Sequence, residues 1–147
     1  MKAPGDPGAD ADEWDAAGVR PRLDLHLGIR TRSDSPGTCV ATMRLRPEHR
    51  NIEGRIHGGV FLTLLDTTMG HAVASKREED VQRAATMQLS CQFLAPPVGE
   101  RMECHARIVR LGGRSAFVEG SVRDEHGTEI ARAHGVWRVW RAGDTPP

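Results

Sequence analysis

One carboxylate within an apolar stretch is the side chain of this 147-residue sequence best placed to do chemistry. A long apolar helix is predicted to follow a glycine-rich turn and to close in the charge cluster at residues 77–80, and from Gly58 to Ala74 its only titratable side chains are Asp66 and His71. The apolar residues that recur there at helical spacing are Leu62, Leu65, Met69 and Val73. This spacing predicts a buried stripe that includes Asp66. An ionised carboxylate there costs roughly several kcal/mol unless it is satisfied. We therefore expect Asp66 either to serve in catalysis or to bond a backbone group or an arginine.

A glycine-rich turn, GRIHGG over residues 54–59, comes directly before the predicted helix. The first N–H groups of a helix have no partner within the helix and lie at the positive end of its dipole. They can stabilise the oxyanion that forms when a carbonyl group is attacked. Glycines at that position let a ligand approach the backbone closely. The turn therefore predicts a carbonyl-binding site at Gly58 and Gly59.

The spacing between this turn and the carboxylate favours a site shared by two subunits. Gly59 and Asp66 are seven positions apart, which is about 10 Å along a helix axis. One chain cannot readily bring its own Asp66 to a carbonyl held at its own helix start. Two antiparallel helices lying side by side could do so, and we therefore expect a homodimer.

The order of predicted elements indicates an α+β fold. Alternating apolar residues predict a strand over 38–46, and four more strands follow the helix. In the first of these four, Met87 and Leu89 are predicted to face one way and Thr86 the other. We expect an antiparallel sheet of five to six strands wrapped around one long central helix. A second subunit is expected to cover the other face of the sheet and an edge strand.

The sequence divides into one domain with two tails. Residues 1–20 are predicted to be a flexible N-terminal tail, 21–142 the folded domain and 143–147 a C-terminal tail. A short helix is predicted within residues 14–27.

Charge and composition argue against several functions. The 20 basic and 20 acidic residues give a formal net charge of zero, so we expect no binding to nucleic acid or to a membrane surface. No apolar run is long enough to span a bilayer, and because the first residues are acidic and lack an apolar central region we expect no secretory signal there. Cys39, Cys91 and Cys104 are widely spaced, which predicts reduced thiols in a cytoplasmic protein. Since CxxC and HExxH motifs are absent, we expect no metal.

The pattern Asn51-x-x-Gly54-x-x-His57-Gly58-Gly59, followed by Leu65-Asp66, resembles a known family. It is similar to the hotdog-fold thioesterases of the PaaI-like and Arthrobacter-type 4-hydroxybenzoyl-CoA thioesterase group. The likeness covers about residues 23–140. It implies a hotdog fold and an acyl-CoA thioesterase that hydrolyses its substrate to a carboxylic acid and coenzyme A. It also implies a homodimer that pairs into a homotetramer, and no cofactor apart from the coenzyme A of the substrate.

The resemblance implies roles for five residues. Asp66 matches the family's helical carboxylate, which acts as nucleophile or as general base. Gly58 matches the residue whose backbone N–H polarises the thioester carbonyl, and Asn51 and His57 match side chains beside that carbonyl. Thr86 falls where related enzymes place a hydroxyl that orients the attacking water. Because the family's site lies between subunits, Asp66 and Thr86 of one subunit would face Asn51 and Gly58 of the other.

Structural roles also remain open for these residues. His57 could bond only a turn carbonyl, Asn51 could stabilise only the turn, and Thr86 is ordinary strand composition. The further residues expected to contact substrate are Gly59, Phe61, Leu62, Met69, Met87, Arg83, Arg110 and Arg114. The arginines would bind the coenzyme A phosphates, or would otherwise be solvated strand ends.

Two other functions remain open from the sequence. A non-catalytic acyl-CoA-binding or regulatory hotdog domain would keep the pocket without turnover. A hotdog hydratase or dehydratase usually relies on a histidine and an acid in a different helix-start pattern, which this sequence lacks. The acyl group of the substrate cannot be read from the sequence.

Overall fold

The computed structural model describes residues 22–77 and 80–145. Its elements are α1 (Arg22–Leu27), β1 (Ile29–Arg32), β2 (Thr38–Arg44), η1 (Pro47–His49), α2 (Gly58–Ala74), β3 (Val81–Phe93), β4 (Arg101–Leu111), β5 (Ser115–Asp124) and β6 (Glu129–Arg141). The predicted long helix is seen as α2, which begins at Gly58 and ends at Ala74, before the charge cluster at residues 77–80 that was expected to close it. The predicted short helix is seen as α1, and residues 1–21, with the predicted tail, lie outside the described part. The sequence did not predict β1.

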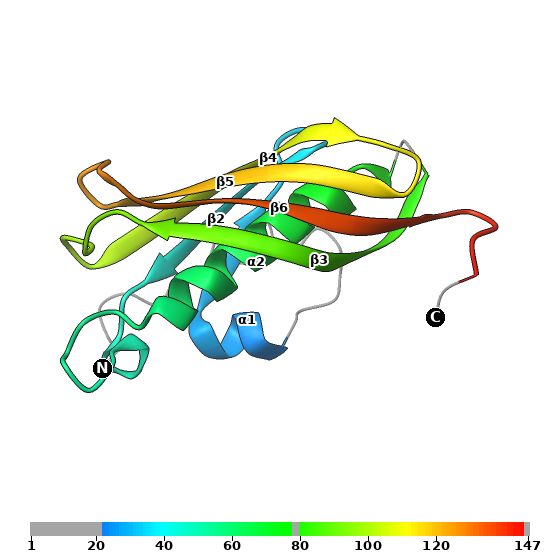
Figure 1. Cartoon of the computed structure of the whole chain (residues 1–147). Helices are drawn as coiled ribbons and strands as arrows, with labels where there is room; N and C mark the ends of the chain where they lie inside the picture. The colour runs from blue at the N-terminus through cyan, green and yellow to red at the C-terminus, as the bar shows by residue number, and fades with distance from the viewer. Residues whose placement is uncertain (1–21, 78–79, 146–147) are drawn as a thin grey trace.

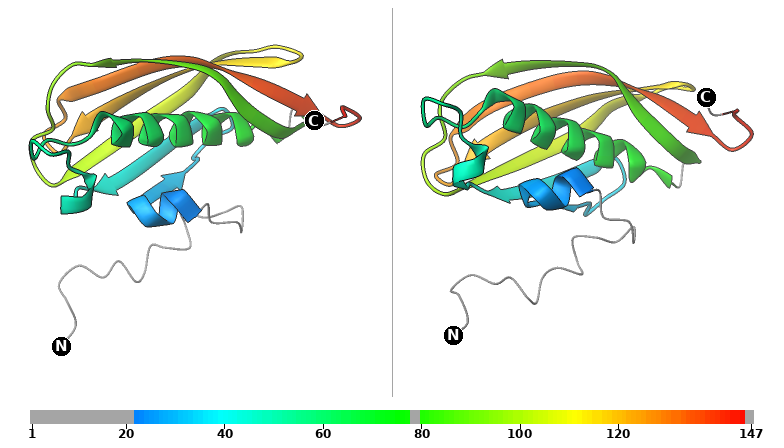
Figure 2. Two further views of the ribbon diagram at one scale, coloured as in Figure 1. Left: turned by 60° about the horizontal axis from the view of Figure 1, so that its bottom comes forward. Right: turned by 90° about the horizontal axis from the view of Figure 1, so that it is seen from below.

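The six strands form one antiparallel sheet in the order β1-β2-β4-β5-β6-β3. Figure 1 shows the sheet curled around α2, and the further views in Figure 2 show α1 on the side of α2 away from the sheet. The predicted α+β architecture, a sheet wrapped around one long helix, is therefore confirmed.

The core lies between the concave face of the sheet and α2. Alternate residues of β2, β4, β5 and β6 are buried as predicted, among them Cys39, Ala41, Met43, Met102, Cys104, Val118, Val122, Trp137 and Val139. The buried residues of α2 that face them are Val60, Phe61, Leu64, Leu65, Thr68, Met69, Ala72 and Val73. This apolar contact anchors α2 against the sheet and fixes its rotation.

The buried face of α2 differs from the predicted stripe. Leu62 keeps 38% of its surface exposed, and Asp66 is only half-buried. The prediction that both lie in the buried stripe is therefore wrong. Because the curled sheet covers a wide arc of the helix, sequence neighbours such as Leu64 and Leu65 are both buried. Each residue advances about 100° around a helix, so Asp66 falls on the flank of the buried arc.

β3 does not alternate regularly. Its pairing with β6 shifts between Thr86 and Gln88, which marks a β-bulge at Met87. Thr86 bonds a residue of α2 and Leu89 packs against the core, whereas Met87 is 63% exposed. The prediction that Met87 and Leu89 share a face opposite Thr86 is therefore wrong. One extra residue reverses the alternation, so the residues before and after it reach the same face.

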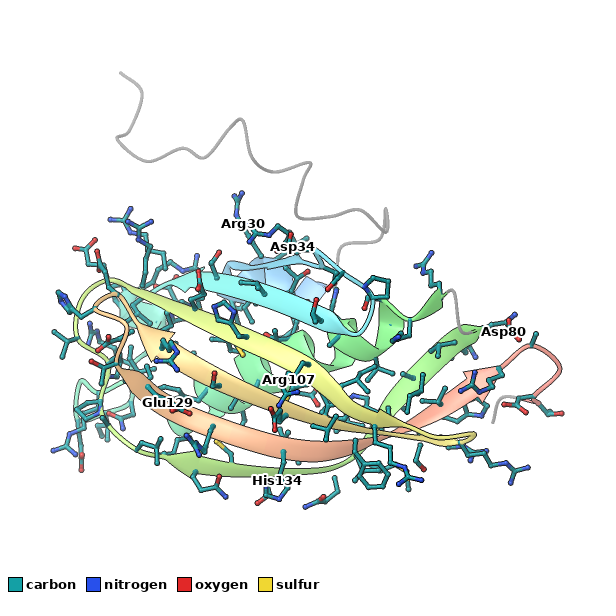
Figure 3. The ribbon with its side chains drawn as sticks, turned by 90° about the horizontal axis from the view of Figure 1, so that it is seen from above. Arg30, Asp34, Asp80, Arg107, Glu129 and His134 are labelled. Carbon is teal, nitrogen blue, oxygen red and sulfur yellow. The ribbon has the colours of Figure 1, made fainter. Side chains whose placement is uncertain are left out.

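The outer face of the sheet is charged. Figure 3 looks onto this face, from which Arg107, Glu129 and His134 project. Arg107 pairs with Glu119 at 2.6 Å, and Glu129 pairs with Arg132 at 2.8 Å. Antiparallel sheets commonly have one solvated face, so this face does not need the covering subunit that we expected from the sequence.

The two edges of the sheet differ in length. β1 has four residues, whereas β3 has thirteen and is paired on one side only. A long strand edge presents unpaired backbone N–H and C=O groups to a possible partner. β3 is therefore the edge at which a second copy could join the sheet.

Gly135 on β6 faces the bulge of β3. A Cβ at this position would lie 2.6 Å from the backbone oxygen of Gln88 and 2.7 Å from the ring of Trp137. Gly120 on β5 is a matched comparison, because its Cβ would meet only the flexible ends of Leu65 and Met69, at 3.1 Å. A flexible side chain can move aside, but a paired backbone carbonyl cannot do so without disturbing the sheet.

We predict that Gly135→Ala lowers the free energy of unfolding by about 3 kcal/mol and Gly120→Ala by about 1 kcal/mol. Equilibrium unfolding in urea measures both changes. Equal losses in the two variants would show that the carbonyl of Gln88 imposes no special constraint.

Candidate active site

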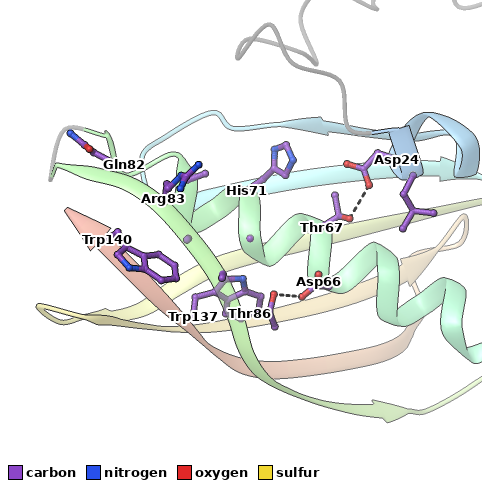
Figure 4. A pocket seen from close by; sticks show the side chains of 14 residues that line it. Asp24, Asp66, Thr67, His71, Gln82, Arg83, Thr86, Trp137 and Trp140 are labelled. Carbon is purple, nitrogen blue, oxygen red and sulfur yellow. Dashed lines mark hydrogen bonds between the residues drawn. The ribbon is translucent and has the colours of Figure 1, made fainter. Parts of the chain in front are cut away.

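Asp66 lies where the flank of α2 meets the edge strand β3 (Figure 4). The hydroxyl of Thr86 donates a hydrogen bond of 2.6 Å to Asp66 Oδ1. This contact exists because the bulge of β3 lets Thr86 point inward. A carboxylate can accept several hydrogen bonds, so Asp66 retains capacity to bind a water molecule. The structure thus brings together two of the predicted site residues.

A pocket of about 680 Å³ opens beside Asp66, with walls from α1, α2, β3 and β6. The pocket exists because several of its lining residues are small, namely Gly70, Ala74, Ala84 and Ala85. The indole rings of Trp137 and Trp140 form part of its wall. Indole rings offer flat apolar surface with one polar N–H each. The volume lies in the range of small-molecule sites, about 300–1,000 Å³. The pocket can therefore hold a small organic group next to the carboxylate.

A second carboxylate in this pocket was missed from the sequence. Asp24 on α1 is 8% exposed and accepts a hydrogen bond of 3.0 Å from the Thr67 hydroxyl. His71 Nδ1 lies 3.3 Å from the Thr31 hydroxyl of β1. These contacts tie α1 and β1 to α2 and hold the wall of the pocket. No sequence signal pointed to Asp24, because its burial depends on how α1 packs.

The turn before α2 is held by its own hydrogen bonds. Asn51 Oδ1 accepts the backbone N–H groups of Glu53 and Arg55, each at 3.0 Å. The backbone N–H of His57 donates to the carbonyl of the buried His49 at 2.9 Å. Asn51 therefore has the structural role that the sequence left open. The NH₂ group of the same side chain is the part that can donate to a substrate.

The start of α2 offers a backbone donor. His57 Nδ1 accepts the N–H of Gly59 at 2.9 Å, so His57 caps the helix and Gly59 is already paired. Within residues 22–77 and 80–145, the N–H of Gly58 finds no acceptor. A Cβ on Gly58 would lie 3.5 Å from Phe93, whose ring packs edge-on against Phe61 with centroids 5.8 Å apart. The donor therefore lies beside an apolar aromatic pair.

The two halves of the predicted site lie apart within one chain. Gly58 and Asp66 are eight positions apart on α2, which is about 12 Å along its axis. The pocket beside Asp66 includes none of Asn51, His57 and Gly58. One chain thus presents a carboxylate with a pocket at one place and a carbonyl-binding turn at another.

The other predicted substrate contacts are spread over the fold. Arg83 lines the pocket, Phe61 is buried, and Leu62 and Met87 are exposed. Met69 is fully buried in the core beneath the sheet. The predicted contact of Met69 with substrate therefore has no support from its position.

The three predicted phosphate-binding arginines lie at one end of the sheet. Arg110 and Arg114 flank the β4–β5 hairpin, which Arg141 ties to the end of β6 through hydrogen bonds to two hairpin carbonyls. That end of β6 pairs with the part of β3 that carries Arg83. All three arginines are exposed, so they are available to an anionic ligand.

Thiol and metal chemistry find no support in the described residues. The three cysteines are free, as predicted. Burial raises the pKa of the Cys39 thiol to about 11 and that of Cys104 to about 12, so both stay protonated near neutral pH. Among residues 22–77 and 80–145, no three His, Cys, Asp or Glu side chains are grouped to hold a metal ion. No helix in that part is long and apolar enough to cross a membrane.

Known proteins resemble this chain in sequence and in structure. Residues 53–131 match the family described as the thioesterase superfamily. A Pseudomonas aeruginosa protein named "Putative esterase" is 36% identical over 121 residues, which are 81% of this chain and 88% of that protein. The human protein named "Acyl-coenzyme A thioesterase 13" is 27% identical over 86 residues, 58% of this chain and 60% of that protein.

The structural likeness extends over almost the whole chain. The PaaI protein of the Escherichia coli phenylacetic acid degradation operon has a TM-score of 0.78 and 21% identity, and the match covers 91% of this chain and 94% of that one. At this identity the likeness shows the fold alone, and it confirms the predicted hotdog fold. Family membership is shown by the match over residues 53–131 and by the Pseudomonas relative. This chain therefore belongs to the thioesterase superfamily.

Proposed function

We propose that this protein is an acyl-CoA thioesterase, which hydrolyses an acyl-CoA to a carboxylic acid and coenzyme A. The observation that carries the proposal is the hydrogen bond of 2.6 Å from Thr86 to Asp66 at the side of a pocket. This bond orients a carboxylate toward space that an acyl group can occupy. A positioned general base contributes roughly 10²–10⁴-fold to a rate.

In the proposed reaction, Asp66 takes a proton from a water molecule while the water oxygen adds to the thioester carbon. The Gly58 N–H at the helix start donates to the developing oxyanion, with Asn51 and His57 beside it. The tetrahedral intermediate then breaks its C–S bond, and the leaving thiolate takes the proton from Asp66. Direct attack by Asp66, followed by hydrolysis of the resulting anhydride, uses the same groups. Heavy-oxygen label from water enters Asp66 in a single turnover only by this second route.

The proposed active unit is a homodimer joined along β3. This strand is a thirteen-residue open edge beside Asp66. A twofold axis there would set the two α2 helices antiparallel and bring Gly58 of one subunit toward Asp66 of the other. That arrangement would bring the two groups to one carbonyl, although Gly58 and Asp66 of the same chain lie about 12 Å apart along the helix axis. A homotetramer built from two such dimers stays a prediction.

The substrate class follows from charge and likeness. We propose that Arg83, Arg110 and Arg114 bind the phosphates of coenzyme A, since guanidinium groups recognise phosphate oxygens in pairs. The human relative is named an acyl-coenzyme A thioesterase, which supports the choice of a coenzyme A thioester as substrate. The narrower resemblance to 4-hydroxybenzoyl-CoA thioesterases stays a prediction.

We predict that Asp66→Asn lowers kcat at least about a hundredfold with little loss of stability, because the side chain keeps its shape at a half-buried position. Thr86→Val should cost about tenfold through loss of one hydrogen bond, and Thr86→Ser should restore most of it. Thiol release from a panel of acyl-CoAs measures these rates. Wild-type turnover in Asp66→Asn would reject the assignment. Binding without any turnover by the wild type would instead indicate an acyl-CoA-binding domain.

The shared site can be tested at Gly58, the first residue of α2. Proline is tolerated at this position because its N–H has no helical acceptor, and His57 before it is extended, with ψ 135°. Gly58→Pro therefore removes the N–H with little other change. Gly58→Ala is the matched control, because it keeps the N–H and its Cβ has ordinary contact with Phe93 at 3.5 Å.

We predict that Gly58→Pro lowers kcat about a hundredfold or more, and that Gly58→Ala costs far less. Mixing Gly58→Pro protein with Asp66→Asn protein should restore about a quarter of wild-type activity after subunit exchange. The reason is that half of the random dimers are mixed, and each mixed dimer has one intact site. If native mass spectrometry shows mixed dimers without restored activity, the two groups do not act across subunits.

A further inference from the structure

The indole N–H of Trp137 is a donor on the pocket wall that the proposed reaction does not use. The Trp137 side chain is 1% exposed and lines the pocket beside Asp66. Within residues 22–77 and 80–145, its N–H has no hydrogen-bond acceptor. An indole N–H can only donate, so a molecule in the pocket must supply its acceptor. Such a group in a pocket points to a ligand that supplies the acceptor.

The two carboxylates near this donor each have a hydroxyl partner already. The pairs of carboxylate, hydroxyl and imidazole groups at the pocket are Asp66 with Thr86, Asp24 with Thr67, and His71 with Thr31. The indole of Trp140 on the same wall is only partly buried. Trp137 is thus the buried side chain of this wall that makes no hydrogen bond to the described residues, whereas Asp66 keeps its remaining capacity for the attacking water.

The N–H is reached through the gap that Gly70 leaves. A Cβ on Gly70 would lie 3.4 Å from Trp137 Nε1, and both residues line the pocket. The ring of Trp137 is held by the core, so the direction of its N–H is fixed. Gly70 follows Asp66 by four positions on α2, which is about 6 Å along the helix axis.

We infer that Trp137 selects acyl groups that carry a hydrogen-bond acceptor oxygen in their distal part. This inference rests on the proposed function, because it takes the pocket beside Asp66 as the acyl site. With the thioester carbon at Asp66, an acceptor near Gly70 lies several bonds away along the acyl group. The substrate class is therefore an acyl-CoA with a distal ether, keto or hydroxyl oxygen.

The selectivity arises from the cost of covering the donor. An apolar acyl group displaces water from the N–H and supplies no acceptor, so the donor is left buried and unpaired. That cost corresponds to about a tenfold to hundredfold loss of affinity. Sites built to bond a polar substituent reject analogues without it for the same reason.

The test uses pairs of acyl groups that differ by one oxygen in place of a methylene group. The probes are hydrolysis-inert thioether analogues of 5-methoxypentanoyl-CoA and heptanoyl-CoA, and of 4-methoxybenzoyl-CoA and 4-ethylbenzoyl-CoA. Calorimetric titration of the full-length protein gives each Kd. In whichever pair binds more tightly, the oxygen-containing member should bind about tenfold more tightly or better.

Two variants connect the preference to the N–H. Gly70→Ala places a methyl group against Nε1 and should abolish the preference, whereas Ala74→Val adds bulk one turn further along the same pocket and should preserve it. Trp137→Phe removes the donor and should also abolish it. If Trp137→Phe melts at a much lower temperature than wild type, Gly70→Ala decides the matter.

The outcomes separate the inference from the proposed function. Affinities equal to within about twofold in both wild-type pairs would overturn the inference, and so would a preference that survives in Gly70→Ala. A wild-type protein that prefers the oxygen-containing analogues yet hydrolyses none of the matching thioesters would overturn the thioesterase proposal and leave the inference standing.

Discussion

The hydrogen bond between Thr86 and Asp66 depends on one extra residue in β3. A regular strand that buries Leu89 would point Thr86 away from α2. The bulge at Met87 reverses the alternation, so both residues reach the inner face. Gly135 on the neighbouring strand makes room, since the carbonyl of Gln88 lies where a Cβ would be. A backbone irregularity and one glycine thus position the carboxylate and its partner.

A second constraint is that α2 carries both groups that the proposed reaction needs. The helix start provides the N–H of Gly58, and the flank provides Asp66, eight residues later. Both belong to one rigid helix whose buried face is held by the sheet. No side-chain rotation can remove a separation of about 12 Å along that axis. Joining the two groups at one carbonyl therefore requires another copy of the helix rather than a movement within the chain.

The parts of the fold with local signals could be predicted from the sequence. The glycine-rich turn ending at Gly59, the long helix that follows it and the hairpin after Leu111 all rest on residues close together in the chain. Asp66 stood out because it is the one acid in an apolar helix. Gly135 is a signal in the sequence that could have located the close contact with β3 but was not used, since glycine within an alternating strand indicates close approach of another backbone.

The remaining features depend on contacts that a linear pattern does not record. The exposure of Leu62 follows from how wide an arc of the helix the sheet covers. The bulge at Met87 leaves no trace in composition, because an inserted residue can be as apolar as its neighbours. The burial of Asp24 depends on where α1 docks, and the pocket itself arises only where four elements meet.

Because the pocket lies beside the open edge of β3, the proposed dimer formation and the proposed hydrolysis would depend on the same strand. In the proposed dimer, β3 supplies both the pairing surface and the residue that orients Asp66. A lone subunit would hold its carboxylate and acyl pocket out of reach of any oxyanion donor, and would leave a thioester intact. Pairing along β3 would then supply the donor and cover the open backbone in one step. A long edge strand, usually a liability, would under this arrangement be retained because the site is incomplete without its partner.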